Sequence, residues 1–203
     1  MKKTIVFDLG GVLLDWNPRY LYNQIFSDQE EMEYFLAEIC SPSWNAQMDA
    51  EKSFQEGIGE LLPKYPDYSE QIQMYHERWI EMLRGEIPDS VEVLRELKDS
   101  GCQLAALSNW SVETFPKVKD QYDFLGWFNP LILSGEVGVA KPDPSIYQIL
   151  LQKLDRPPDH CVFIDDVLEN ITEAERQGFE TIHFISGESL RADLEERGYL
   201  RKS

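Results

Sequence analysis

The stretch Thr4–Val12, which reads Thr-Ile-Val-Phe-Asp-Leu-Gly-Gly-Val, constrains the fold of this chain more than any other. Its first four residues are β-branched or aromatic, and this apolar run, too short for a helix, is typical of a buried parallel strand. The run ends on Asp8, and Gly10 and Gly11 would let the backbone turn sharply and approach a ligand closely. A carboxylate at the carboxyl end of a central strand lies where open α/β sheets bind substrates, although a strand that ends in an acidic turn is the simpler interpretation.

From Pro88 onward, short apolar runs alternate with helical patterns. This alternation predicts an α/β fold, a doubly wound parallel sheet whose first strand is the Thr4–Phe7 run. The later strands are predicted over Gln103–Leu107, Leu131–Leu133, Cys161–Ile164 and Thr181–Ile185, with helices over Ser145–Leu154, Leu168–Gln177 and Leu190–Arg197 and a Gly-rich loop over Gly135–Ala140.

Between the first strand and Gly85 the pattern is helical. Four sets of apolar residues at helical spacing follow one another, and no clear strand separates them. We therefore expect a core domain built from residues 1–15 and 86–203, with residues 16–85 inserted as a small helical cap domain. Trp16 and Trp44 fall in loop-like positions of this insert and are candidates for lining a substrate pocket, whereas Trp79 is expected to pack the cap core.

The acidic composition limits the partners of the protein. The 203 residues carry a formal net charge of -18, so the surface would repel nucleic acid and anionic membranes. It would repel an anionic substrate too, unless the site carried a local cation. Three scattered cysteines do not make a disulfide framework, and no apolar run approaches the length of a signal sequence or a membrane span. We expect a soluble, cytoplasmic protein, and its oligomeric state stays open.

Polar side chains follow three of the predicted strands, and a lysine lies in a loop just before a predicted helix. The set consists of Asp8, Ser108, Asn109, Lys141, Asp165 and Asp166. Because the carboxyl ends of parallel strands meet at one edge of a sheet, these side chains can converge there. Three neighbouring carboxylates repel one another unless a cation joins them, and an oxygen-only set suits Mg²⁺ better than Zn²⁺.

These residue types suit phosphoryl transfer. Asp8 can act as a nucleophile and form a covalent intermediate, which water then hydrolyses. Mg²⁺ would screen Asp8 from an incoming phosphate and polarise the phosphoryl oxygens, while Lys141 would neutralise charge and orient the Asp8 carboxylate. Ser108 and Asn109 would donate hydrogen bonds to the transferring group. The expected partner is therefore a small phosphorylated metabolite.

Taken together, these segments resemble the four motifs of the haloacid dehalogenase-like hydrolase superfamily. The motifs are Asp8-x-Gly-Gly-Val, Leu107-Ser108-Asn109, Lys141-Pro142 and Ile164-Asp165-Asp166. Their order and spacing span nearly the whole chain, and the helical insert is similar to the cap of that family. The resemblance implies a Rossmann-like core and, in metal-dependent members, an ion held by the nucleophile, a backbone carbonyl two residues on and a fourth-motif acid. Carried over, these are Asp8, the carbonyl of Gly10 and Asp166, with Asp165 assisting.

One position departs from the family pattern. Most phosphatases of the superfamily have a second Asp two residues after the nucleophile, as general acid and base, and here that position is Gly10. The Asp-x-Gly start is similar to that of a bacterial α-D-glucose-1-phosphate phosphatase-like group, which makes sugar phosphates candidate substrates. Loss of a positioned acid/base costs about 10²–10⁴-fold in rate, so we expect modest turnover, a good leaving group, or a proton donor from the substrate or the cap.

Two other functions stay open. A metal-independent 2-haloacid dehalogenase would use Asp8 to displace halide, but it has no need of a second carboxylate cluster at 165–166. A non-catalytic phospho-ligand-binding protein with a decayed site would explain Gly10, but not the presence of Asp8, Lys141 and Asp166. The main prediction is a Mg²⁺-dependent phosphatase that hydrolyses small phosphomonoesters through an aspartyl-phosphate on Asp8.

Overall fold

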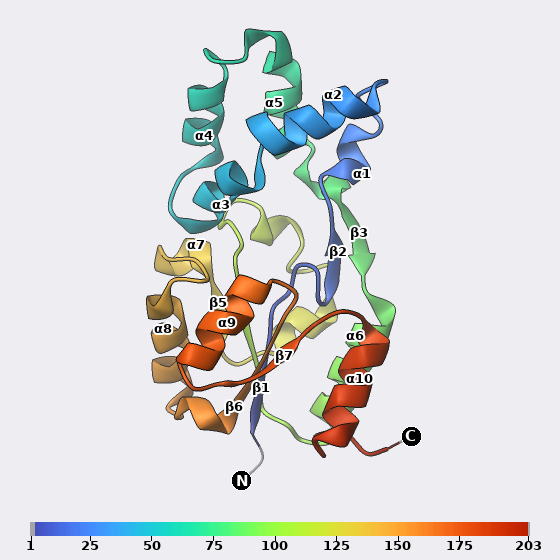
Figure 1. The fold of residues 1–203 in the computed structure, drawn as a ribbon, viewed down its shortest axis with the longest axis vertical. Helices are drawn as coiled ribbons and strands as arrows, with labels where there is room; N and C mark the ends of the chain where they lie inside the picture. Colours follow the sequence, from blue (N-terminus) through green and yellow to red (C-terminus); the bar gives the residue numbers. More distant parts are fainter. Residues whose placement is uncertain (1–2, 203) are drawn as a thin grey trace.

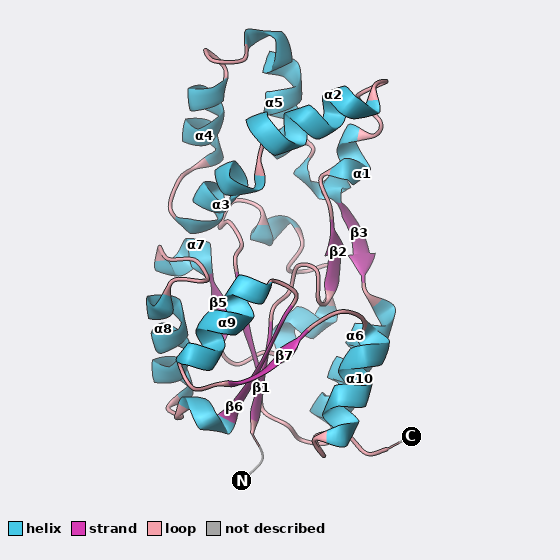
Figure 2. Ribbon diagram, viewed as in Figure 1, coloured by secondary structure: helices cyan, strands magenta, loops and turns pink. Residues whose placement is uncertain are grey.

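A five-stranded parallel sheet forms the centre of the lower half of the molecule (Figures 1 and 2) in the computed structural model, which describes residues 3–202. The strands are β1 (Thr4–Phe7), β4 (Leu104–Ser108), β5 (Leu131–Leu133), β6 (Cys161–Asp165) and β7 (Glu180–His183). Their order is β5-β4-β1-β6-β7, and every neighbouring pair is parallel. The predicted parallel sheet is confirmed, and β1 lies at its centre, so that its carboxyl end adjoins those of β4 and β6.

Helices cover both faces of this sheet. They are α6 (Pro88–Asp99), α8 (Pro144–Leu154), α9 (Leu168–Arg176) and α10 (Gly187–Glu196). Val6 of β1 packs in a core with α8 and α9, whereas Ile5 and Phe7 face the opposite core with α6 and α10. All residues of β1, β4 and β6 are buried, as expected for parallel strands covered on both sides. Within residues 3–202, no helix combines the length and the apolarity needed to cross a bilayer.

A layer of helices stands above the carboxyl edge of the sheet, in blue to green at the top of Figure 1. It contains α1 (Arg19–Tyr22), α2 (Gln29–Tyr34), a π-helical stretch (Phe35–Ile39), α3 (Pro42–Ala50), α4 (Phe54–Leu61) and α5 (Ser69–Glu77). Side-chain caps fix two of the starts: Ser41 accepts a hydrogen bond from the Trp44 amide at α3, and Ser53 forms a capping box with Glu56 at α4. These helices occupy the predicted cap segment, whose status as a separate domain stays a prediction.

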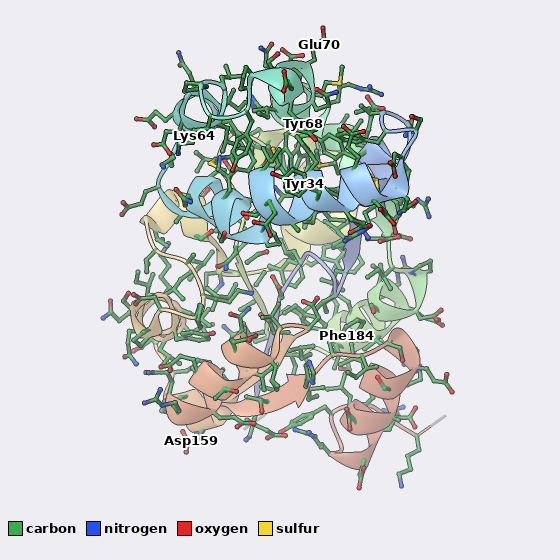
Figure 3. All side chains as sticks on the ribbon, turned by 45° about the horizontal axis from the view of Figure 1, so that its top comes forward. Tyr34, Lys64, Tyr68, Glu70, Asp159 and Phe184 are labelled. Atoms are coloured by element: carbon green, nitrogen blue, oxygen red, sulfur yellow. The ribbon has the colours of Figure 1, made fainter. Side chains whose placement is uncertain are left out.

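Aromatic rings form the interior of the helical layer. Trp44 meets Tyr75 edge to face at 5.0 Å between ring centroids, and its Nε1 donates to the Gly57 carbonyl at 3.1 Å. Trp44 is therefore a packing residue of this layer. Nearer the surface, the rings of Tyr34 and Tyr68 lie 6.4 Å apart (Figure 3).

Two short strands that the sequence analysis did not predict join the layer to the sheet. β2 (Leu14–Trp16) and β3 (Leu83–Glu86) pair antiparallel, with Trp16 opposite Leu83. The expectation of no strand here was wrong because Leu83 continues the helical spacing before it, and pairing with a distant segment leaves no local pattern. A one-turn helix, α7 (Ser134–Val137), also replaces the start of the predicted Gly-rich loop.

Candidate active site

Asp8 follows β1, and its side chain is almost completely buried at the carboxyl edge of the sheet. The Leu9 amide donates to its Oδ1 at 2.7 Å, and Lys141 Nζ lies 3.1 Å from the same oxygen. Burial raises the pKa of Asp8 to about 7; Lys141 opposes this rise, the carboxylates at 165 and 166 add to it, and the Ser108 hydroxyl lowers it slightly. Asp8 is thus a desolvated carboxylate held by one cation.

Lys141 bridges two carboxylates. Its Nζ contacts Asp8 at 3.1 Å and Asp165 at 2.6 Å, and its side chain is completely buried. Burial by itself lowers the pKa of Lys141, but the two carboxylates outweigh it and raise the pKa above its usual value. Lys141 therefore remains an ammonium ion that fixes the direction of Asp8.

Asn109 positions this lysine. Its Oδ1 accepts a hydrogen bond from the Lys141 amide at 2.8 Å, and its Nδ2 donates to the Lys141 carbonyl at 2.9 Å. The structure thus places the Asn109 amide on the main chain of the Lys141 loop, and its predicted donation to the transferring group stays a prediction. Ser108, the last residue of β4, is buried and lines the same cavity as Asp8.

The two acids after Ile164 have different surroundings. Asp165 is fully buried and accepts hydrogen bonds from Lys141, from the Val167 amide at 2.8 Å and from Asn170 Nδ2 at 3.0 and 3.1 Å. Asp166 lines the cavity, and within the described chain only its own main chain hydrogen-bonds its carboxylate. Partial burial and then Asp165 raise the pKa of Asp166. Asp165 holds the lysine, while the oxygens of Asp166 are available to a ligand.

The donor set fits a hard divalent cation. Asp8, Asp165 and Asp166 each offer an oxygen within 4.8 Å of the others. Gly10 lines the same cavity, and the lining residues of the described chain include neither a histidine nor a cysteine. Carboxylate and carbonyl oxygens are the ligands that Mg²⁺ takes in proteins.

The two glycines after Asp8 differ in whether the structure would tolerate a side chain at their position. Gly11 has φ +74°, and a Cβ on it would lie 2.4 Å from Asp166 Oδ2. Gly11 is therefore required both by the backbone and by the space that Asp166 occupies. A Cβ on Gly10 would meet nothing within 4 Å, and Gly10 has no positive φ. The structure has room for a side chain at the position where the acid/base is missing.

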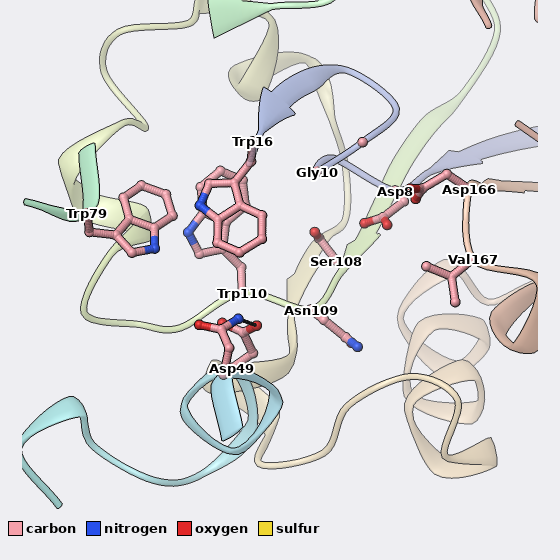
Figure 4. A pocket seen from close by; sticks show the side chains of 12 residues that line it. Asp8, Gly10, Trp16, Asp49, Trp79, Ser108, Asn109, Trp110, Asp166 and Val167 are labelled. Atoms are coloured by element: carbon pink, nitrogen blue, oxygen red, sulfur yellow. Dashed lines mark hydrogen bonds between the residues drawn. The ribbon is translucent and has the colours of Figure 1, made fainter. Parts of the chain in front are cut away.

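A cavity of about 330 Å³ opens from Asp8 toward the helical layer (Figure 4). Its lining residues are Asp8, Gly10, Gly11, Trp16, Asn45, Asp49, Trp79, Ser108, Asn109, Trp110, Asp166 and Val167. Indole rings make one side of it, where Trp79 and Trp110 lie 5.7 Å apart between centroids. Figure 4 shows Asp49, on a helix of the layer, across the pocket from Asp8.

A second cavity, of about 350 Å³, is lined by residues between Trp16 and Tyr75 and shares three lining residues with the first. These are Trp16, Asn45 and Asp49. Two buried polar atoms of this shared region, Trp16 Nε1 and Asn45 Oδ1, have no hydrogen-bond partner among the described residues.

Sequence reasoning placed Trp16 among the candidates for the pocket but missed several other lining residues. Trp79, expected to pack the cap core, lines the cavity as well. Asn45 and Asp49 lie one helical turn apart on α3, and this i,i+4 polar pair was the available signal. One sequence offered no reason to rank this pair above other polar pairs of the cap.

Comparisons with known proteins agree with this geometry. A model of the haloacid dehalogenase-like hydrolases matches residues 2–178. The chain is 27% identical to the sesquiterpene phosphatase astK of Aspergillus oryzae, covering 96% of this chain and 95% of the relative, and 22% identical to a phosphorylated carbohydrates phosphatase of Thermotoga maritima, covering 90% and 85%. A HAD family enzyme from Bacteroides thetaiotaomicron, solved with magnesium and inorganic phosphate, shares the fold with a TM-score of 0.70 at 22% identity, over 92% of this chain and 96% of that one.

Proposed function

Because the chain belongs to the haloacid dehalogenase-like hydrolases, we propose that it is a Mg²⁺-dependent phosphatase that hydrolyses small phosphomonoesters through Asp8. The observation that carries this proposal is the group of Asp8, Asp165 and Asp166 within 4.8 Å, with the buried Lys141 between two of them. The phosphatases among the relatives support the reaction class.

In this mechanism Asp8 Oδ attacks the phosphorus atom and the ester oxygen leaves, which forms an aspartyl-phosphate that water then hydrolyses. Lys141 holds the carboxylate and neutralises part of the charge that arrives with the phosphate. The Ser108 hydroxyl, on the same cavity, donates to the transferring group, as the Asn109 amide was predicted to do.

Asp8, the Gly10 carbonyl and Asp166 would hold Mg²⁺, with Asp165 assisting. When bound, Mg²⁺ screens the carboxylates from the incoming phosphate and polarises its oxygens. The hydrogen bonds already made to Asp165 favour Asp166 as the direct ligand of the pair.

The shared region of the two cavities favours an organic group that carries hydroxyls, as in sugar phosphates. Trp16 Nε1 offers a donor and Asn45 Oδ1 an acceptor, and both are buried without a partner in residues 3–202. A hydrocarbon chain would leave both unpaired, at a cost of about 1–3 kcal/mol each, whereas a sugar can satisfy both and stack on the indole rings. We therefore place carbohydrate phosphates ahead of terpenoid phosphates as substrates.

Phosphate release tests the proposal. The assay would use a panel of sugar phosphates, a prenyl phosphate and 4-nitrophenyl phosphate, with Mg²⁺ and with EDTA. We expect Mg²⁺-dependent release that Asp8→Asn lowers by at least about 10³-fold. Asp159→Asn is the matched control, because this exposed acid comes just before β6, at the amino edge of the sheet, and does not line the cavity.

The other outcomes separate the remaining functions. Halide release from a 2-haloacid in EDTA, without phosphate release from any ester, would establish the dehalogenase instead. Tight binding of inorganic phosphate with no turnover of the 4-nitrophenyl ester would establish a binding protein.

A further inference from the structure

The proposed phosphatase reaction needs a proton donor, and position 10 does not provide one. The oxygen of an alkyl or sugar ester leaves as an alkoxide unless a proton reaches it in the transition state. Gly10 has no side chain, although the space around it is open. The donor must therefore project into the cavity from elsewhere in the protein.

Few titratable side chains of the described chain line either cavity. Asp8 and Asp166 belong to the nucleophile and metal group. In the second cavity, Arg19 is paired with Glu33, and a guanidinium does not give up its proton in proteins. Burial raises the pKa of Cys40, and likewise that of Tyr75, far above the neutral range, so neither becomes a proton-accepting base.

That leaves Asp49, which lines the same cavity as Asp8 and lies across it from Asp8 (Figure 4). Asp49 lines both cavities, whereas Asp8 lines only the first. An ester with its phosphate at Asp8 and its organic group toward the second cavity would extend past the shared residue Asp49, and its bridging oxygen would then lie between Asp8 and Asp49. Figure 4 shows Asp49 and Asp8 on opposite sides of this space.

The Asp49 side chain and main chain are both held in place. Asn45 Nδ2 donates to Asp49 Oδ2 at 2.7 Å. The fully buried Ser134 hydroxyl donates a hydrogen bond to the Asp49 carbonyl and accepts one from the Trp110 amide at 2.9 Å. These two bonds tie α3 to the core. The carboxyl group is therefore positioned by two elements rather than carried on a free loop.

We propose that Asp49 is the general acid and base of the reaction, supplied from the helical layer in place of a side chain at position 10. As Asp8 Oδ forms its bond to phosphorus, the bond from phosphorus to the ester oxygen breaks with its electron pair on oxygen, which takes the Asp49 proton. The products are an alcohol, the aspartyl-phosphate and an Asp49 carboxylate. Water then attacks phosphorus, Asp49 takes a proton from it, and the bond to Asp8 breaks, which releases phosphate and restores both acids.

The electrostatic surroundings agree with this role. Burial raises the pKa of Asp49 to about 7, with a smaller contribution from the Asp8 charge, while hydrogen bonds from the Ser111 main chain and from Asn45 oppose the rise. An acid whose pKa lies near the working pH is well suited both to give and to take a proton. Asp8 is the charged group that acts on Asp49 in the described chain.

A series of esters that differ only in their leaving group tests the assignment without knowledge of the natural substrate. The series runs from 4-nitrophenyl phosphate, whose phenolate leaves without a proton, through phenyl phosphate to glycerol 2-phosphate and glucose 1-phosphate. The quantity compared is kcat/KM, which reports the first chemical step. The proteins are wild type, Asp49→Asn, the control Glu51→Gln on the same helix end, and Asp49→Asn combined with Gly10→Asp.

We expect Asp49→Asn to lower kcat/KM about 10²–10⁴-fold for the alkyl esters and less than about tenfold for the 4-nitrophenyl ester. Gly10→Asp in the Asp49→Asn background should restore part of the alkyl rate. In wild type the ratio of the alkyl-ester rate to the nitrophenyl-ester rate should fall as the pH rises above about 7, because Asp49 loses its proton. The ionisation of Asp8 affects both rates equally and therefore does not change this ratio. Asp49→Asn should remove this pH dependence.

An equal loss for all esters would overturn the role of Asp49 and leave the phosphatase proposal intact, as would an unchanged alkyl rate in Asp49→Asn. If wild type released no phosphate even from 4-nitrophenyl phosphate, the proposed function would fail, and the role of Asp49 with it.

Discussion

The pocket has two walls that are built in different ways. We define the core wall as Asp8, Ser108, Asn109 and Asp166, and the cap wall as Asn45, Asp49 and Trp79, all lining the same cavity. Adjacent parallel strands in register bring the core wall together, so backbone hydrogen bonds set its geometry. Side-chain packing within the helical layer and a few contacts to the core set the cap wall. The rigid wall suits the phosphate, common to all substrates, and the other wall suits the organic group and its proton.

The largest effect that would sharpen this comparison comes from Lys141, the buried cation that contacts Asp8 of the core wall. Lys141→Met leaves Asp8 and Asp165 facing each other without their ammonium, and breaking a buried pair in this way costs about 3–5 kcal/mol. We expect a loss of that size in the free energy of urea unfolding and a loss of activity. Lys153→Met, an exposed lysine of α8, is the control and should change the stability by less than about 0.5 kcal/mol. Equal stability of the two variants would contradict the central role of this ion pair.

A smaller effect separates the two glycines behind Asp8. Gly11→Ala forces a Cβ against Asp166 at a positive φ, so we expect a loss of about 1–3 kcal/mol in the free energy of unfolding. Gly10→Ala enters open space and should change the free energy of unfolding by less than about 0.5 kcal/mol. Similar losses of unfolding free energy in both variants would show that the space around Gly10 does not accept even a methyl group.

The core wall could be predicted from the sequence because its residues follow apolar runs that are recognisable one at a time. Asp8 and Asp166 both come after such runs, and the carboxyl ends of parallel strands meet at one edge of the sheet, which brings the two residues together. Lys141 was found by a different local signal, its place in a loop just before a strong helix start at Asp143-Pro144.

The cap wall could not be predicted in the same way. The polar pair that Asp49 forms with Asn45 does not reveal its role: the other groups that shift its pKa, the Ser111 main chain and the Asp8 charge, lie far away in the chain. Trp79 fits an apolar helical pattern and also faces the cavity, and periodicity does not distinguish these roles. The pairing of β2 with β3, which places Trp16 at the pocket, joins segments that are distant in sequence.

The desolvation of Asp49 predicts a pH-dependent stability. Its pKa is raised in the folded protein, so the folded state binds more protons than the unfolded state between about pH 4 and pH 7, and the stability falls as the pH rises through this window. Asp49→Asn removes this cost. The difference in unfolding free energy between Asp49→Asn and wild type should therefore grow by about 4 kcal/mol in favour of the variant between pH 4 and pH 8. A constant difference across this range, measured by urea unfolding, would contradict the burial of an ionising group.

The smallest effect concerns the link between the walls. Ser134→Ala leaves the buried Trp110 amide and the Asp49 carbonyl without their shared partner, so we expect a loss of about 1 kcal/mol in stability and about a tenfold lower kcat/KM for glycerol 2-phosphate. The rate for 4-nitrophenyl phosphate should change less, because that ester does not need the Asp49 proton. Ser90→Ala is the matched control, since Ser90 is equally buried but its hydroxyl has no partner among residues 3–202. If Ser134→Ala slowed both esters alike, its effect would lie in the core wall, and the cap wall would take its position from the packing of its own helices alone.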